Sequence, residues 1–266
     1  QTIRLSQFAD DLRPILQTFK TGAHLMVGVR DLLNKESFDA IGRTLSDTAE
    51  ACLRRVIEDQ QEKLASRFGD PVDSEGSPAE MVAVALGKFG GREPNYHSDL
   101  DITFLYTQDG ETVRRVGGPR TTLSNRQFFN QLAQNVIRQI DSQQDRLYEI
   151  DLPFARGADE TVLTDSMTQF LKPFRHGSAP LWQRVTLCQA RPISGSSSAK
   201  NLVRKTVDRA VSLTPWSASD FAEMKLFRQR SELTARPDNL KRGMGGTVDV
   251  QCIFAAGKLQ AASSGA

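Results

Sequence analysis

The amino-acid sequence predicts an α+β protein in which a small mixed sheet is flanked by helical segments. Three observations lead to this prediction. The first seventy residues carry apolar side chains at helical spacing, and short apolar runs typical of strands begin only after residue 80. Helical periodicity then returns from about Lys200 to Arg236. The chain is therefore expected to place its sheet between two largely helical parts.

Residues 1–70 form the first expected helical part. A helix is expected over residues 38–68, because this stretch contains no proline and no Ser/Gly cluster. Its apolar residues recur every three or four positions at Leu45, Ala49, Cys52 and Val56. A shorter helix that includes Leu25 and Val29 precedes it and is expected to stop near Asn34.

The clearest boundary in the sequence follows this helical part. Residues 69–78 are rich in Gly, Pro, Asp and Ser, which are the residues that favour turns. We therefore expect a helical segment over residues 1–70, a linker over residues 71–78, and a second domain with C-terminal helices over residues 79–266.

The second domain is expected to open with strands. A buried strand is predicted over residues 81–86, ending at Gly87, and further strands over residues 101–106 and 147–152. An exposed loop is expected around Gly110 and Gly117-Gly118. A helix is expected to begin near Ser124 with one apolar stripe, formed by Phe128, Phe129, Leu132, Val136 and Ile140.

Composition narrows the class of protein. The chain has 34 basic and 32 acidic residues, and this near balance, without a basic stripe interleaved with aromatic residues, gives no support for nucleic-acid binding. No stretch approaches the roughly 20 apolar residues of a membrane-spanning helix, and no signal-peptide pattern opens the chain. Three cysteines without metal-ligand spacing favour a reducing compartment. A cytoplasmic protein without a membrane or nucleic-acid partner is therefore expected.

The most informative region joins the first two predicted strands. The strand over residues 81–86 runs into a glycine-rich turn, Gly87-Lys88-Phe89-Gly90-Gly91, whose backbone N–H groups can approach a phosphate without side-chain clash. Ser98 and the acidic pair Asp99 and Asp101 follow at the start of the next strand. Alternation along a strand would place the two carboxylates on one face, where a divalent cation relieves their repulsion.

A third acidic position completes this expected site. Glu149 and Asp151 repeat the acid-x-acid pattern on the strand predicted over residues 147–152. If this strand lies beside the strand over residues 101–106, Asp151 supplies the third carboxylate of a two-metal site. Mg²⁺ is the expected ion, because it binds one or two carboxylates together with phosphate oxygens. Each piece alone also suits a plain turn or a solvated strand edge.

Longer sequence strings resemble a known family. The string GKFGGREPNYHSDLDITFLY (residues 87–106) is similar to the signature of bacterial glutamate–ammonia-ligase adenylyltransferases. These are bifunctional enzymes that adenylylate and deadenylylate glutamine synthetase, and they carry two related nucleotidyltransferase halves. The similarity continues, in family order, in RDLL (30–33), RQFFNQLAQNVI (126–137), LYEIDL (147–152), QARPISG (189–195) and NLKRGMGG (239–246).

The resemblance implies a polymerase-β-like nucleotidyltransferase core in residues 79–266 and a specific reaction. One half of such an enzyme would move AMP from ATP to a tyrosine of glutamine synthetase. Mg²⁺ would be the cofactor and a PII-type protein a regulatory partner. The resemblance also implies catalytic and metal-binding roles for Asp99, Asp101 and Asp151. It also implies nucleotide-binding roles for a second set of residues, Gly87, Lys88, Gly90, Gly91 and Ser98.

Two alternatives stay open at the level of the sequence. The strings SDLD, FLY and LYEIDL and the pair Val248-Asp249 resemble the adenylylating half more than the deadenylylating, phosphorolytic half. Pro153 and Ala155 stand where the family has two arginines, and Arg156 is only a shifted candidate for one of them. The lost arginines favour a catalytically degenerate docking module, whereas the three intact carboxylates disfavour it.

Overall fold

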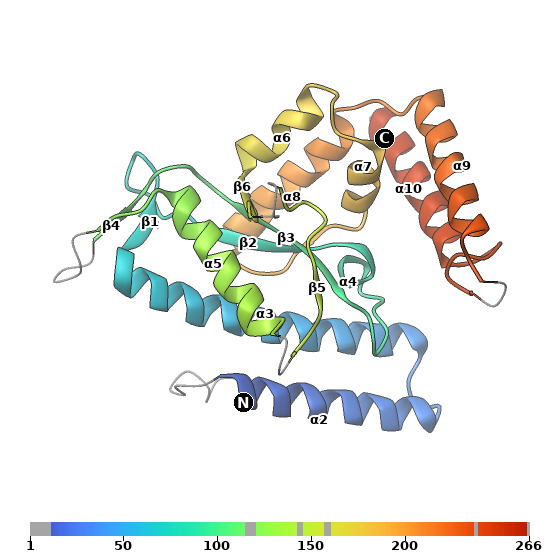
Figure 1. The fold of residues 1–266 in the computed structure, drawn as a ribbon, viewed down its shortest axis with the longest axis horizontal. Helices are drawn as coiled ribbons and strands as arrows, with labels where there is room; N and C mark the ends of the chain where they lie inside the picture. The colour runs from blue at the N-terminus through green and yellow to red at the C-terminus, as the bar shows by residue number, and fades with distance from the viewer. Residues whose placement is uncertain (1–11, 115–120, 143–145, 157–160, 237–238, 265–266) are drawn as a thin grey trace. The chain divides into compact units, whose positions relative to one another are not determined.

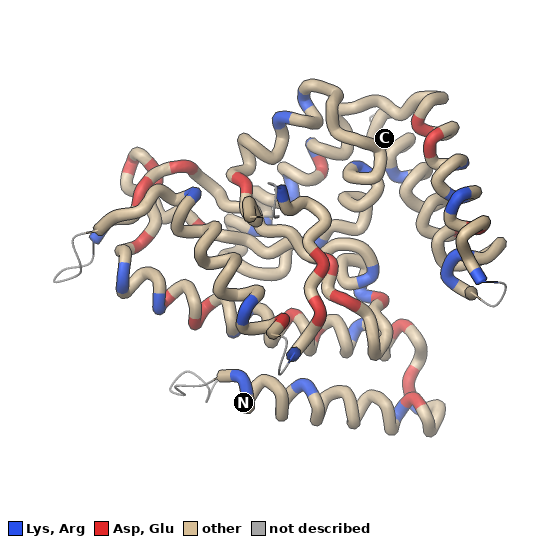
Figure 2. The backbone as a smooth tube through the Cα atoms, in the orientation of Figure 1, with Lys and Arg blue, Asp and Glu red and all other residues tan. Residues whose placement is uncertain are grey.

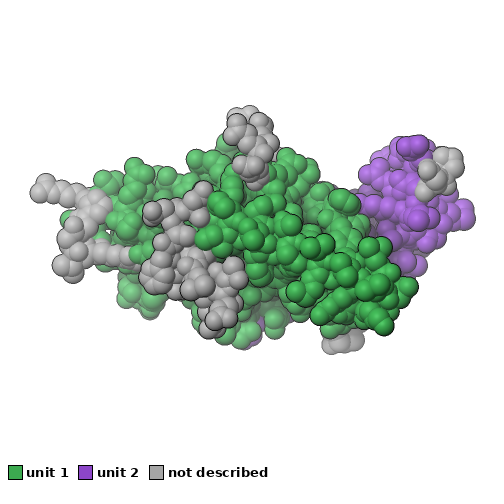
Figure 3. Space-filling model, turned by 90° about the horizontal axis from the view of Figure 1, so that it is seen from below, with its two compact units in different colours: residues 1–170, 189–204 green, residues 171–188, 205–266 purple. Residues whose placement is uncertain are grey.

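A computed structural model describes residues 12–114, 121–142, 146–156, 161–236 and 239–264 (Figure 1). The chain divides into two compact units, and Figure 3 colours them separately. Unit 1 comprises Gln1–Phe170 and Gln189–Arg204, and unit 2 comprises Leu171–Cys188 and Lys205–Ala266. Unit 1 holds the strands, so the α+β class is confirmed. The segments expected over residues 1–70, 71–78 and 79–266 stay a prediction about domains.

The two N-terminal helices lie where the sequence places them. Helix α2 spans Arg13–Leu32 and helix α3 spans Phe38–Phe68. Asn34, with a φ of 52°, takes a left-handed conformation after α2. The Ser37 hydroxyl caps α3 by accepting a hydrogen bond of 3.2 Å from the Ala40 N–H. Gly69, with a φ of 90°, ends α3, because an L side chain rarely adopts this conformation.

The central sheet of unit 1 is mixed, as predicted. Strands β2 (Met81–Ala85) and β3 (Leu100–Tyr106) pair antiparallel, and the two-residue strand β7 (Arg191–Pro192) continues the sheet beside β2. On its other side β3 pairs parallel with two short strands, β5 (Ile150–Asp151) near its start and β6 (Thr164–Ser166) near its end. The order β5-β3-β2-β7 makes β7 an edge strand, where Pro192 is tolerated.

A second, smaller sheet corrects two expectations. Strand β1 (Asp70–Val72) pairs antiparallel with β4 (Glu111–Val113). The first residues of the expected linker are therefore a strand, and part of the expected exposed loop is its partner. Gly117-Gly118 lies outside the described residues. The buried Asn125 side chain joins the two regions, because its Nδ2 donates to the carbonyls of Val72 and Gln108 at 2.9 and 3.0 Å.

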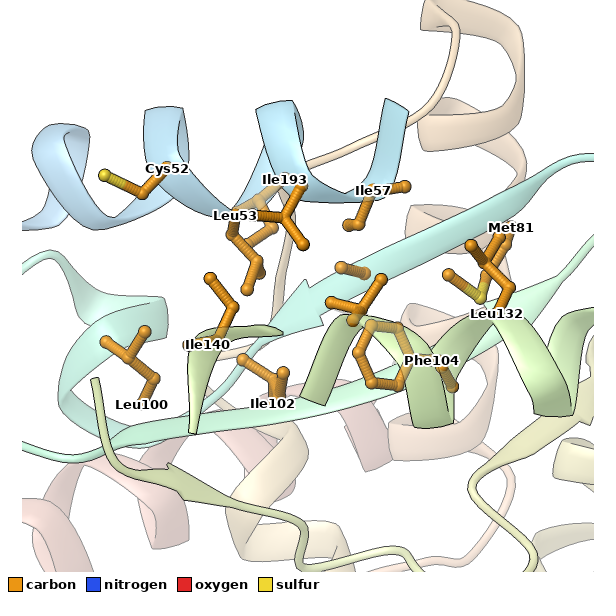
Figure 4. Close-up of a cluster of buried hydrophobic side chains, with 14 of the residues drawn as sticks. Cys52, Leu53, Ile57, Met81, Leu100, Ile102, Phe104, Leu132, Ile140 and Ile193 are labelled. Atoms are coloured by element: carbon orange, nitrogen blue, oxygen red, sulfur yellow. The ribbon is translucent and has the colours of Figure 1, made fainter. Parts of the chain in front are cut away.

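Helices α3 and α5 pack on one face of the central sheet and form its core. Helix α5 spans Asn125–Ile140 and begins with a capping box between Ser124 and Gln127. All five apolar residues predicted on its stripe are fully buried. Figure 4 shows Leu53 and Ile57 of α3 and Leu132 of α5 gathered over Ile102 and Phe104 of β3. This packing fixes the strands that carry the candidate site.

The remaining helices follow β6. Helix α6 spans Met167–Arg175, α7 spans Leu181–Leu187, α8 spans Ser197–Ser212, α9 spans Ala218–Leu233 and α10 spans Thr247–Ser264. The helical periodicity predicted from about Lys200 to Arg236 is confirmed as two helices, α8 and α9. Among the described helices, none combines the length and the apolar character needed to cross a lipid bilayer.

Candidate active site

The glycine-rich turn (residues 87–91) follows directly from β2. It forms one short helical turn, α4 (Gly87–Gly91), and Arg92 ends it in the left-handed conformation with a φ of 61°. The Leu86 N–H donates to the Asp101 carbonyl at 2.8 Å, so the entrance of the turn is bonded to the start of β3. Gly90 is buried and Gly91 is exposed. The turn thus lies immediately beside the strand that carries Asp101.

Gly87 and Asp101 are in close contact. Gly87 has a φ of +50°, and a Cβ atom built on it would collide with the Asp101 carboxylate. Glycine is therefore required here for two reasons, the backbone conformation and the space that the carboxylate fills. The sequence indicates a role of Gly87 towards phosphate only, and the structure adds a contact with Asp101.

Asp101 and Asp151 are brought together by the sheet. In the parallel pair of β3 and β5, Leu100 is the register partner of Ile150 and Asp101 is the partner of Asp151. The Leu100 N–H donates to the Glu149 carbonyl at 2.9 Å, and the Ile150 N–H donates to the Asp141 carboxylate at 2.9 Å. Neighbouring strands lie about 4.8 Å apart. Figure 2 shows acidic positions on both segments where β5 runs beside the start of β3. The expected adjacency of these strands is confirmed, although β5 is shorter than the strand expected over residues 147–152.

Asp99 is placed differently from the other two carboxylates. It precedes β3 and is exposed, whereas Asp101 is partly buried within the strand. Across the described part of the chain, no three His, Cys, Asp or Glu side chains converge closely enough to form a metal cluster. Like charges repel unless a cation lies between them. The three side chains offer only carboxylate oxygens, which are the donor type that a hard cation such as Mg²⁺ prefers.

Ser98 follows the turn, and Lys88 is part of it. The Ser98 hydroxyl lies in a local turn, where it accepts from the Asn95 N–H at 2.9 Å and donates to the Asn95 carboxamide at 3.0 Å. Lys88 lies within the turn and is partly exposed. Gly91 lies beside the side chains of Gln189 and Glu93, which are hydrogen-bonded to each other at 2.9 Å.

Arg156 is held by an ion pair. It forms an ion pair with Asp165 of β6, and both line a polar cavity of about 500 Å³ together with Arg126 and Tyr106. Burial raises the pKa of Asp165, and the charges of Arg156 and Arg126 oppose this change. The ion pair argues against Arg156 as a replacement for either arginine lost at Pro153 and Ala155.

One residue close to the turn was not predicted from the sequence. Arg191 of β7 donates to the carbonyls of Phe89 and Gly90, both at 3.2 Å. A contact between residues a hundred positions apart leaves no periodicity to detect. The string QARPISG (residues 189–195), which resembles the family, contains Arg191 and could have pointed to this residue, but the resemblance did not indicate what the arginine does.

Comparisons with known proteins bear on the family of this chain. The family model for glutamate-ammonia ligase adenylyltransferase matches residues 2–205. Three curated relatives are named bifunctional glutamine synthetase adenylyltransferase/adenylyl-removing enzyme. The protein from Pasteurella multocida is 29% identical over 90% of this chain and 24% of its own length. The protein from Thioalkalivibrio sulfidiphilus is 28% identical, over 88% and 24%. The protein from Pseudomonas aeruginosa is 27% identical, over 94% and 26%.

The chain thus spans about a quarter of the length of these relatives, and the family model covers most of the chain, including the glycine-rich turn and all three carboxylates. The chain therefore belongs to the glutamate-ammonia ligase adenylyltransferase family.

Proposed function

We propose that this chain is the adenylylating half of such an enzyme and moves AMP from Mg·ATP to a tyrosine hydroxyl of glutamine synthetase. The observation that carries the proposal is the register pairing of Asp101 with Asp151 next to the glycine-rich turn. Carboxylates on two neighbouring strands, next to a glycine-rich turn, are suitable for binding a nucleoside triphosphate together with Mg²⁺. The relatives' names attach both adenylyl transfer and adenylyl removal to proteins of this kind.

In the proposed reaction the tyrosine oxygen attacks the α-phosphorus of ATP. The bond from that phosphorus to the oxygen that bridges it to the β-phosphorus breaks, pyrophosphate leaves, and the proton of the tyrosine hydroxyl is released to solvent. Asp99, Asp101 and Asp151 would hold Mg²⁺, which when bound neutralises phosphate charge and lowers the pKa of the attacking hydroxyl. Asp151 would lie nearest this hydroxyl. The chain's own contribution is mainly to position the two reactants in line.

The glycine-rich turn would seat the β- and γ-phosphates. The first N–H groups of a helical turn have no acceptor within the helix, and such groups commonly bind phosphate. Here they belong to Gly87, Lys88 and Phe89. Gly91, which is exposed, would let the backbone approach the nucleotide, while Gly90 makes room for the carbonyls of Gln189 and Ala85. Lys88 and Ser98 would add a cation and a hydroxyl at the edge of the nucleotide. Glutamine synthetase is the proposed protein substrate, a PII-type protein the proposed regulator and the cytoplasm the proposed location.

A docking module without catalysis is the second candidate. The observation in its favour is Pro153 and Ala155 at the positions of the family's arginines, next to Asp151 on β5. A chain of this type would bind glutamine synthetase through its surface and leave the carboxylates unused. The intact acidic pair across β3 and β5 disfavours this reading.

A pair of assays on one preparation tests the proposal. The first offers unmodified glutamine synthetase, Mg²⁺ and ATP and follows pyrophosphate release and labelled synthetase. The second offers adenylylated synthetase and inorganic phosphate and follows ADP formation. Pyrophosphate release in the first assay alone supports the adenylylating half. ADP formation alone would reassign the chain to the phosphorolytic half, and inactivity in both would favour the docking module.

A further inference from the structure

The glycine-rich turn is held from behind by one arginine. Arg191 lies on β7, where it is the register partner of Ala85, two residues before the turn begins. Its Nε donates to the Gly90 carbonyl at 3.2 Å, and its Nη2 donates to the Phe89 carbonyl at 3.2 Å. The guanidinium thus bonds two successive carbonyls of the turn.

The same guanidinium is anchored to α3. Its Nη1 forms an ion pair of 2.6 Å with Glu50, and its Nη2 donates to the Ser46 hydroxyl at 3.1 Å. The Glu50 side chain is 14% exposed and that of Arg191 is 23% exposed, so water screens this pair little. Ser46 is fully buried, and its hydroxyl also donates to the Phe89 carbonyl at 3.4 Å. Arg191 therefore couples the position of the turn to a helix that is packed in the core.

The turn in turn limits where the Asp101 carboxylate can lie. Gly87 leaves no room between its Cα and that carboxylate, since even a Cβ atom would collide with it. Gly90 is closely approached by the backbone carbonyls of Gln189 and Ala85. A shift of the turn at Gly87 is therefore expected to displace the Asp101 carboxylate, because these two groups already lie in close contact.

We propose that Arg191 is a positioning residue, which through the glycine-rich turn fixes the Asp101 carboxylate in the place needed to bind Mg²⁺. This inference rests on the proposed function, in which Asp101 is a metal ligand. Nε, Nη1 and Nη2 of Arg191 reach partners in different directions, and the single ammonium group of a lysine cannot reproduce this. Residues that hydrogen-bond a metal ligand directly typically change metal affinity or activity 10–100-fold when replaced, and this range is the upper bound expected for Arg191, which acts through the turn.

The test compares Arg191→Lys and Arg191→Met with a matched control, Arg54→Met. Arg54 contacts the same Glu50 carboxylate at 3.7 Å but is a largely exposed residue of α3. Mg²⁺ binding is measured by calorimetry in the presence of a non-hydrolysable ATP analogue. AMP transfer is measured as a function of Mg²⁺ concentration. Hydrogen exchange of residues 86–93 is measured without Mg²⁺ or nucleotide, and thermal unfolding checks the fold.

The apparent Mg²⁺ affinity of Arg191→Lys is expected to be weaker by up to roughly 10–100-fold. Excess Mg²⁺ is expected to restore part of its AMP transfer activity. Faster hydrogen exchange at the turn is expected as well, with Arg54→Met resembling the wild type. Should Arg191→Met fail to fold, Arg191→Lys decides. Unchanged Mg²⁺ dependence and unchanged exchange in a folded Arg191→Lys protein would overturn the inference, and so would loss of folding in that variant, since a purely structural role would then suffice.

The experiment separates this inference from the proposed function. A wild-type chain that binds no Mg²⁺ and transfers no AMP would refute the proposed function and with it the metal-positioning role, whatever the exchange data. A wild-type chain that is active, together with an Arg191→Lys variant that has normal Mg²⁺ dependence, would refute the positioning role alone.

Discussion

Asp101 and Asp151 are register partners across the parallel pair of strands β3 and β5. Although fifty positions separate them in sequence, the sheet places their backbones about 4.8 Å apart, the ordinary spacing of neighbouring strands. Like charges on neighbouring strands repel each other, and a bound cation relieves this repulsion. Such a pair is therefore expected to contribute to ligand binding at the expense of stability.

Neutralising Asp101 or Asp151 is expected to lower activity without lowering stability. Asp101→Asn and Asp151→Asn should each lower AMP transfer by roughly 10³-fold or more, because several kcal/mol of metal-dependent stabilisation are lost. Without Mg²⁺ the melting temperature of each variant should be equal to that of the wild type or higher. Glu149→Gln, one residue before β5 and ion-paired with Arg146, is the control and should retain transfer. Near-normal transfer by Asp101→Asn would contradict the two-metal site.

Two adjacent glycines of the turn are expected to respond differently to alanine. A Cβ atom on Gly90 would collide with the backbone carbonyls of Gln189 and Ala85, which cannot separate without disturbing β2 and β7. Gly90→Ala should therefore lower the free energy of unfolding by about 1–3 kcal/mol or more. A Cβ atom on Gly91 meets only the ends of two flexible side chains, at 2.9 and 3.1 Å.

Gly91→Ala should accordingly cost less than about 0.5 kcal/mol, the usual effect of a change away from the core. Urea denaturation of both variants measures the difference. If Gly91→Ala destabilises as much as Gly90→Ala, the packing described here around the turn is wrong. A tolerated change at Gly91 also makes Gly91→Val suitable for testing nucleotide affinity in a folded protein.

The stability of unit 1 is expected to fall at mildly acidic pH because of His24. This residue of α2 lies near the rings of Tyr96 and Tyr148, each 6.4 Å from it between centroids. Its Nε2 is buried and has no hydrogen-bond partner among the described residues. Burial, and secondly the charge of Lys20, lower the pKa of His24 in the folded chain.

The unfolded chain therefore binds a proton more readily than the folded chain. Stability from this residue is fully present above the unfolded pKa of about 6.5 and is lost as the pH falls below it. His24→Phe should weaken the dependence of the free energy of unfolding on pH between about 7.5 and 5.5. His176→Asn, an exposed change in unit 2, serves as the control. The same slope in wild type and His24→Phe would exclude this role.

Arg184 is expected to stabilise unit 2. Its side chain is 2% exposed, forms an ion pair of 3.0 Å with Asp220 and donates to the Thr214 carbonyl at 2.7 Å. Arg184→Leu would leave the Asp220 carboxylate, only 14% exposed, without this partner and should cost about 3–5 kcal/mol. The exposed pair of Arg43 with Asp39 is the comparison, and Arg43→Leu should cost at most about 1 kcal/mol.

Tryptophan fluorescence measures this effect in the relevant unit. The chain has two tryptophans, Trp182 and Trp216, and both belong to unit 2. The urea midpoint of unit 2, followed by tryptophan fluorescence, should shift to lower concentration in Arg184→Leu. Arg43 lies in unit 1, so the midpoint of Arg43→Leu is followed by circular dichroism and should stay nearly unchanged. Equal shifts in the two variants would show that the buried pair has no special importance.

Long periodic elements were predictable from the sequence, whereas the short strands β6 and β7 were not. The bounds of α3 follow from an uninterrupted apolar pattern between Ser37 and Gly69, both of which have clear capping roles. Strands β6 and β7 contain Asp165 and Pro192, residues that disfavour strands, and they exist because β3 and β2 offer them hydrogen-bonding edges. Such pairing depends on the tertiary fold and leaves no local pattern.

The candidate site shows the same division. The glycine-rich turn and the Asp99-x-Asp101 pattern are local, so spacing was sufficient to find them. The adjacency of Asp151 could be stated only as a condition, because register between distant strands is set by packing. Arg191 was missed for a related reason, since its partners on α3 and in the turn lie about a hundred or more positions away.

The discontinuous path of unit 2 has a consequence for shortened versions of the chain. Its first part, Leu171–Cys188, precedes the β7 segment that belongs to unit 1, and its second part begins at Lys205. No single cut therefore releases either unit intact. Truncation after Arg204 would keep α7 but remove Asp220 and Thr214. The Arg184 guanidinium would then lack both of these partners. During synthesis, likewise, β7 emerges from the ribosome only after unit 2 has been started, so neither unit can be completed before the other has begun.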